Sequence, residues 1–193
     1  MLKKISIVIS VFFMGIALAQ VDEYEYGIAP NYSVNLYTGY PVIKAASFDH
    51  YDKSRPVAGI SIGTPYGYYA NDFYVNANIE IFRYIFRNSH NVDDRFGGTA
   101  FQVGINTGLF IGDVSVSLTA ATGVFHAGTG FISGLNIDLP AGEYILGNFD
   151  INESLVPHIE ALEVRFTTRA NMVQKKDGIT GWIDGGFSIG YEF

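Results

Sequence analysis

The sequence predicts an all-β fold, an antiparallel up-and-down transmembrane β-barrel of eight strands. Two observations on composition support this: 48% of the residues are hydrophobic and only 16% are charged, and Gly (22), Phe (15) and Tyr (13) are abundant. The third is that no apolar run of about 20 residues, the length of a spanning helix, follows the first twenty positions. A membrane barrel reconciles these facts, because its strands carry apolar residues at alternate positions rather than in runs.

The N-terminus has the pattern of a secretory signal peptide. Lys3 and Lys4 form a basic start, residues 5–18 are mostly apolar, and Ala17-Leu18-Ala19 is a small-x-small cleavage site. The apolar run is shorter than a membrane anchor needs. We therefore expect a signal peptide over 1–19, a periplasmic lead-in over 20–30 and an outer-membrane β-barrel domain over 31–193.

Charge and cysteine content exclude several classes of function. Loss of Lys3 and Lys4 with the signal leaves 10 basic and 19 acidic residues, so the net charge changes from −7 to −9. Nucleic acid is not an expected partner, because phosphate contacts need Lys and Arg. The chain has no cysteine, which excludes disulfides, thiol catalysis and a cysteine-linked lipid anchor.

Eight segments alternate between apolar and small or polar residues, the period of a two-faced strand. They are 31–40, 56–64, 72–87, 99–111, 114–126, 131–139, 157–171 and 179–193. Between them we expect polar loops or turns at 41–55, 65–71, 88–98, 112–113, 127–130 and 172–178. No helical period is expected after the signal.

Each strand is justified by its own pattern. The first has Tyr, Val, Leu, Thr and Tyr on one face, and the second alternates Ile with Gly or Ser before the turn Thr64-Pro65-Tyr66-Gly67. The third alternates clearly and ends in aromatic residues interleaved with Arg83 and Arg87, a mixture suited to a membrane interface. The fourth and fifth meet at Gly112-Asp113, which is short enough for a two-residue hairpin.

The later strands leave one segment unassigned. The sixth strand sets Phe131 and Leu135 against Gly134 and Asn136, and the seventh sets apolar residues against Glu163 and the two arginines that follow it. Residues 140–156 between them are ambiguous. Glu143 to Phe149 and residues 22–28 are two further candidate strands, which makes ten strands the alternative count.

The last strand carries the most specific pattern. Ile183, Gly185, Phe187, Ile189, Tyr191 and Phe193 occupy one face, and the chain stops on an aromatic residue. This strand resembles the closing strand of bacterial outer-membrane β-barrels, and the whole chain resembles the small barrels of the OmpA, OmpX and OmpW class. The resemblance implies that Phe187, Ile189, Tyr191 and Phe193 are a signal to the barrel-assembly machinery, and that the C-terminus is periplasmic.

A periplasmic C-terminus assigns the ends of the strands. Loops 41–55, 88–98, 127–130 and 172–178 then face outward, and turns 65–71 and 112–113 face the periplasm. The alternation itself does not say which face of the strands meets lipid. A soluble periplasmic lipocalin-like binding barrel, with the apolar set inside, is the alternative.

With the apolar set outside, polar and charged residues fill the lumen. This predicted polar network comprises Glu80, Gln102, Asn106, Asp138, Glu163, Arg165, Arg169, Asp184 and Glu192. Eight strands enclose just enough space for side chains, so we expect a plug of ion pairs and hydrogen bonds. A narrow polar path is the alternative.

Cations are also expected at the outer rim, where they would pair with lipopolysaccharide phosphates. These are Arg83, Arg87, Arg95, Lys175 and Lys176. The acidic residues of the outer loops are expected to be solvated rather than to bind calcium.

No catalytic residue, metal site or cofactor is predicted. The four histidines show no metal-ligand spacing. Outer-membrane lipid A deacylases have a Ser two residues after the catalytic His, but Gly128 stands two residues after His126. The sequence therefore predicts a non-enzymatic, monomeric barrel of the outer membrane with a structural or surface-interaction role; a narrow channel for small or apolar solutes is the alternative.

Overall fold

A computed structural model describes residues 32–91 and 93–193. The predicted signal peptide (1–19), the whole lead-in (20–30) with the candidate strand 22–28, and the first residue of the predicted barrel domain lie outside this part of the chain. The elements, in chain order, are β1 (Ser33–Lys44), η1 (Ala46–Phe48), β2 (Lys53–Ser54), β3 (Val57–Ala70), β4 (Phe73–Arg87), β5 (Arg95–Ile111), β6 (Val114–Phe125), β7 (Gly128–Leu139), α2 (Ala141–Asn148), η2 (Glu153–Leu155), α3 (Val156–Glu160), β8 (Leu162–Lys175) and β9 (Gly178–Glu192).

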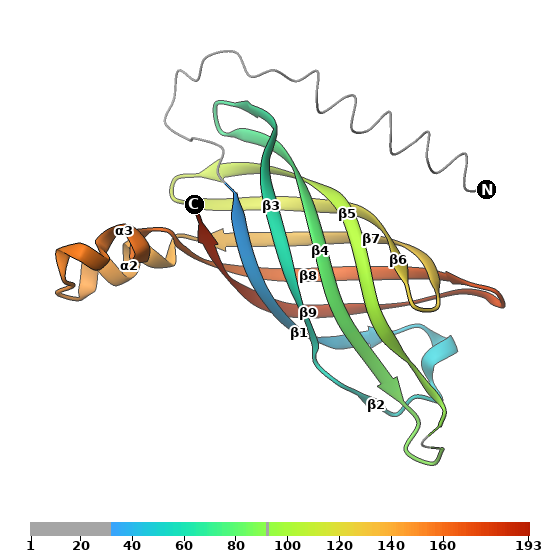
Figure 1. The fold of residues 1–193 in the computed structure, drawn as a ribbon. Helices are drawn as coiled ribbons and strands as arrows, with labels where there is room; N and C mark the ends of the chain where they lie inside the picture. The colour runs from blue at the N-terminus through green and yellow to red at the C-terminus, as the bar shows by residue number, and fades with distance from the viewer. Residues whose placement is uncertain (1–31, 92) are drawn as a thin grey trace.

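The strands form one antiparallel sheet that closes on itself (Figure 1). Eight strands make the ring, and each pairs with its neighbours in chain order, while β9 returns to pair with β1. Strand β2 is a two-residue piece that pairs with the end of β4, where it continues the line of β3. The predicted all-β antiparallel fold with eight strands in the ring is confirmed, and the ten-strand count is wrong.

The two ends of the ring differ. The C-terminus, the hairpin turn at 112–113 and the helices α2 and α3 lie at one end, which we call the C-terminal end (Figure 1). Segment 45–56, segment 88–94 and the short turns 126–127 and 176–177 lie at the opposite end, which we call the loop end. This partition is the one predicted for the loops and turns.

Segment 140–161 contains the helices α2, η2 and α3, so the expectation of no helix after the signal is wrong. The candidate strand from Glu143 to Phe149 is helix α2, and the first residues of the predicted seventh strand are helix α3, so that β8 begins only at Leu162. The helices pack closely, because a Cβ on Gly142 would overlap the carbonyl oxygen of Ile159. Among the described residues no helix is long and apolar enough to cross a membrane.

The predicted turn at 65–71 is also wrong, because β3 continues through it to Ala70. The register between β3 and β4 shifts between Gly63 and Gly67, so three residues of β3 face one residue of β4. Such a bulge accommodates Pro65, which has no N–H to donate to the ladder. The chain reverses at Asn71, whose φ is 51°.

The other loops are shorter than predicted. Strand β1 extends to Lys44, β5 begins at Arg95, β7 begins at Gly128 and β8 extends to Lys175. The backbone hydrogen bonds of closed ladders extend into these segments, whose Gly, Lys and Gln residues look like loop residues in the sequence. Only the hairpin at Gly112-Asp113 is where it was predicted, with Gly112 at a φ of 62°.

The two faces of the ring strands carry different side chains. Every ring strand exposes a large apolar side chain on its outer face: Leu36, Ile60, Ile81, Phe101, Leu118, Leu135, Phe166 and Ile189, each between 47% and 62% exposed. The opposite parity points inward and includes buried Asn, Gln, Ser, Thr, Asp, Glu and Arg side chains.

Candidate functional site

The interior has two parts, a polar network toward the C-terminal end and an aromatic cluster toward the loop end. The strands supply both through the same inward parity. On β4, for example, Asn78 and Glu80 belong to the polar part, and Phe82, Tyr84 and Phe86 continue the same face into the aromatic part. The sequence changes from amide and carboxylate to aromatic side chains along one face of one strand.

Arg169 on β8 is the centre of the polar network. Its guanidinium forms ion pairs with Glu80 on β4 and with Asp184 on β9, where Nε lies 3.1 Å from Oδ1. The guanidinium carbon also lies 3.8 Å from the centre of the Tyr37 ring and 5.0 Å from that of Phe82. One cation therefore links strands on opposite sides of the ring and joins the polar part to the aromatic part.

The two carboxylates around Arg169 have different numbers of other donors. Asp184 is fully buried and also accepts hydrogen bonds from the Tyr37 hydroxyl, from Asn171 Nδ2 at 2.7 Å and from Trp182 Nε1 at 3.0 Å. Glu80 has one further donor, Gln102 Nε2 at 2.7 Å. Asp184 is thus well satisfied even apart from its ion pair, whereas Glu80 depends on Arg169.

A chain of hydrogen bonds between uncharged side chains runs along one side of the interior. Thr167 donates to Asn136 at 2.7 Å, Asn136 donates to Ser117 at 3.1 Å and to Thr119 at 2.9 Å, and Thr119 donates to Asn106 at 2.7 Å. These residues come from β5, β6, β7 and β8. The chain holds four neighbouring strands together on the inside.

A second ion pair lies nearer the C-terminal end. Arg165 pairs with Asp138, which also accepts a hydrogen bond from Ser115 at 2.8 Å. Glu163 and Glu192 lie beside this pair and line, with it, a small pocket of about 150 Å³. The pocket also contains Leu139 and Pro140, where the chain leaves β7 for the helices.

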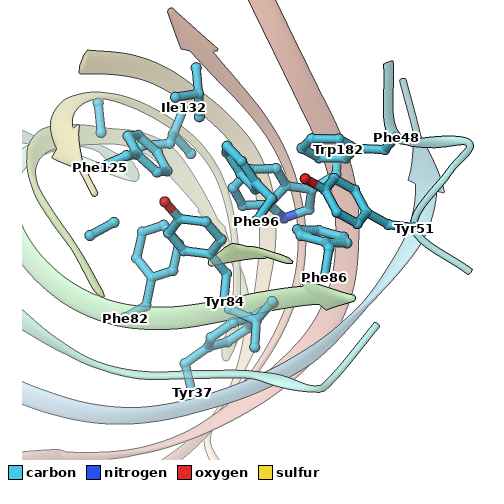
Figure 2. Packing of buried hydrophobic residues seen from close by; sticks show 14 residues of the cluster. Tyr37, Phe48, Tyr51, Phe82, Tyr84, Phe86, Phe96, Phe125, Ile132 and Trp182 are labelled. Atoms are coloured by element: carbon cyan, nitrogen blue, oxygen red, sulfur yellow. The ribbon is translucent and has the colours of Figure 1, made fainter. Parts of the chain in front are cut away.

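The aromatic cluster fills the other half of the interior (Figure 2). Trp182 packs against Tyr84 and Phe86, with ring centres 5.0 and 5.2 Å apart. Phe48, from the short helix η1, is fully buried and packs 4.8 Å from both Phe86 and Phe96. The segment after β1 is therefore not only a surface loop, because it folds the side chains of Phe48 and Tyr51 into the aromatic cluster.

All nine residues of the predicted lumen network lie on inward positions. The structure joins six of them by direct contacts, as Arg169 with Glu80 and Asp184, Arg165 with Asp138, and Gln102 with Glu80. Asn106 belongs to the neutral chain, and Glu163 and Glu192 lie at the pocket.

The aromatic part of the interior was missed. The residues Phe82, Tyr84 and Phe86 were interpreted as a membrane-interface feature, but they share the parity of Glu80. That shared parity, and the presence of Trp182 on the small, polar face of the last strand, are the sequence signals for an inward position.

The predicted terminal signal lies on the outer face of β9. Phe187, Ile189 and Phe193 are 46%, 53% and 66% exposed, and Tyr191 is half-buried, with its hydroxyl 3.0 Å from Nδ1 of His158 on α3. The backbone of Phe193 pairs with that of Tyr32. The aromatic end of the chain thus sits where the last strand joins the first.

The five predicted rim cations all lie at the loop end, but they do not form one group. Arg83, Arg87 and Arg95 line one groove on β4 and β5, whereas Lys175 and Lys176 lie at the turn between β8 and β9. The Lys175 ammonium lies 5.9 Å from the centre of the Phe96 ring.

Within residues 32–91 and 93–193, no group of three or more His, Asp or Glu side chains is placed to hold a metal ion. No known protein family matches the chain, and no curated protein is similar enough to count as a relative.

Proposed function

We propose that the chain is an integral β-barrel of the bacterial outer membrane, with a closed interior and a structural or surface-interaction role. The observation that carries this proposal is the belt of eight large apolar side chains, one on the outer face of each ring strand. Soluble monomers rarely expose contiguous apolar surface on this scale. Hydrocarbon around the ring accounts for the belt, and a closed ladder leaves no strand edge unpaired in lipid.

The buried charges support the same orientation of the faces. A soluble binding barrel of the lipocalin kind has an apolar interior, but Arg169, Glu80 and Asp184 lie deep inside this ring and are at most 8% exposed as side chains. With the C-terminus in the periplasm, the loop end faces outward. Segments 45–56 and 88–94 are then the surfaces for interaction.

The aromatic cluster supports a closed interior rather than a channel. Trp182, Phe48 and their neighbours pack against one another in the loop-end half of the ring (Figure 2), and such an apolar cluster opposes the passage of ions. Purified protein in planar bilayers is expected to show no steady conductance. A stable open level for the wild-type protein would favour the channel instead.

One observation favours a narrow channel as the second candidate. The polar half contains more hydrogen-bonding atoms than the protein can satisfy; Arg169 Nη2, Gln102 Oε1 and Asn78 Oδ1 have no partner among the described residues. Water commonly satisfies such groups. In this alternative the wild-type protein conducts through the loop end, and F48A, which removes a buried aromatic ring from that end, would raise its conductance.

The substitution Leu118→Arg tests the membrane proposal directly. Leu118 is 62% exposed near the middle of β6. In hydrocarbon, an arginine at mid-depth costs about 2–4 kcal/mol, whereas a surface substitution in water usually changes stability by less than about 0.5 kcal/mol. The expected result is a clear loss of folding into lipid vesicles, seen as loss of the gel form that resists detergent until boiled.

Tyr144→Arg is the matched control. Tyr144 is 61% exposed but lies on α2, outside the ring. It should fold like the wild type. Equal folding of the Leu118 and Tyr144 variants, with the wild type in the aqueous fraction, would refute membrane insertion.

A further inference from the structure

A groove of about 410 Å³ lies at the loop end, where the wall formed by β4 and β5 rises above the turn between β6 and β7. Strand β5 pairs with β6 only from Phe101 onward, so its first residues extend beyond that turn (Figure 1). Arg83, Arg87 and Arg95 line the wall, and His126 lies in the turn.

The groove brings like charges together. In the register of β4 and β5, Arg87 stands directly opposite Arg95, a pairing that destabilises a sheet unless an anion lies between the two side chains. Arg83 lies four residues from Arg87 on the same face of β4, about 13 Å along the strand. None of the ion pairs in the described part of the chain involves these three arginines.

The outer wall next to the groove is apolar. Ile81 pairs with Phe101 across β4 and β5, and Phe101 pairs with Val124 on β6. All three side chains are exposed, between 47% and 61%. A ligand that fits both surfaces has anionic groups at one end and hydrocarbon at the other.

We propose that this groove binds the phosphate groups of lipopolysaccharide, with the acyl chains of the lipid along Ile81, Phe101 and Val124. The inference rests on the proposed function, because it needs the loop end to face the outer leaflet. Guanidinium groups form paired, charge-assisted hydrogen bonds to phosphate. Arg83 and Arg87 lie at different positions along β4, which suits a lipid with more than one phosphate. A phosphate bound between Arg87 and Arg95 also offsets the repulsion between these two side chains.

The test uses refolded protein in detergent micelles and three probes: diphosphoryl lipid A, the same lipid stripped of phosphate, and inorganic phosphate. The R87Q/R95Q variant should bind lipid A about tenfold more weakly than the wild type. It should bind the stripped lipid as the wild type does. R87K/R95K keeps the charge and should retain more of the affinity than R87Q/R95Q.

Lys176→Gln is the control, because Lys176 is a cation at the same end but outside the groove. It should bind lipid A as the wild type does. Unfolding of R87Q/R95Q without lipid should need as much urea as the wild type or more, since a like-charge pair is lost. This excludes misfolding as the cause of weaker binding.

The outcomes separate the two proposals. Equal lipid A affinity for the wild type and R87Q/R95Q, in protein that inserts, refutes the groove but not the membrane barrel. If inorganic phosphate binds as tightly as lipid A, the lipid is refuted as the ligand of the groove and a soluble anion is favoured. Protein that stays in the aqueous fraction refutes both proposals.

Discussion

Removal of the charge of Arg169 tests how the interior is held together. Arg169→Met keeps most of the length of the side chain but leaves Glu80 and Asp184 without their cation. Breaking a buried ion pair by removing one partner costs about 3–5 kcal/mol, because the remaining charge stays buried. The side chains of Arg169, Glu80 and Asp184 are 5%, 8% and 0% exposed, so solvent offers little relief. We expect R169M to lower the free energy of unfolding by about this amount.

The structure also predicts which second substitution restores stability. Asp184 keeps three donors without Arg169, whereas Glu80 keeps only Gln102. Neutralising Glu80 should therefore recover about half of the loss, since the charge with fewer partners is the more costly one. E80Q/R169M should be more stable than R169M, and D184N/R169M should recover less, because an amide nitrogen would then face existing donors.

The assay is reversible urea unfolding in detergent micelles, followed by tryptophan fluorescence. Trp182 is the single tryptophan of the chain, and its indole N–H donates to Asp184 at 3.0 Å. Its emission therefore reports on this part of the interior. A loss below about 1 kcal/mol for R169M, or greater recovery with D184N than with E80Q, would refute the assigned roles.

Two further predictions concern the second ion pair and the loops. Arg165→Ala should lower the thermal unfolding temperature, because it leaves Asp138 with one hydrogen bond near the pocket. The decrease should be smaller than that of R169M, since the Arg165 side chain is more exposed than that of Arg169. An unchanged unfolding temperature would count against an ion-paired plug. The hydroxyl and the backbone N–H of Ser89 donate to Asp52 and hold the pKa of that carboxyl below its usual 3.8. Because folding lowers this pKa, the hydrogen bonds that link segments 45–56 and 88–94 should be complete above pH 3.8 and be lost only as the pH falls through the lowered pKa of Asp52. An NMR titration of the Asp52 carboxyl should show this, and a titration midpoint at or above 3.8 would contradict the contact.

The sequence predicted the faces of the strands better than their ends. On β6, Ser115, Ser117 and Thr119 are buried and Leu118 is exposed, as the period of two requires. Strand ends were less predictable, since a ladder bond extends a strand through residues with low strand propensity. Pro65 illustrates this: it has the sequence pattern of a turn, but a bulge absorbs it inside β3.

The helices at 140–161 were not predictable from their own residues. Helices α2 and α3 have eight and five residues, too short to be stable alone. Their stability comes from packing against each other, where Gly142 lies against the backbone of Ile159. A short apolar run such as Tyr144-Ile145-Leu146 fits a strand or a helix equally well until its neighbour is known.

The sequence by itself determined the class of fold and the residues that share a face, because strand periodicity is local and repeats in every segment. It predicted eight strands but left ten open, and only the structure, in which Glu143 to Phe149 is helical rather than a strand, decided between the two counts. It also predicted that nine polar and charged residues, among them Glu80 and Arg169, share the face opposite the large aliphatic side chains. Only the tertiary structure decided that Arg169 forms ion pairs with Glu80 and Asp184, that Phe48 packs inside the ring near Trp182, and that three of the five rim cations share one groove. These contacts join residues far apart in the chain, and their geometry depends on the register and closure of the whole ring.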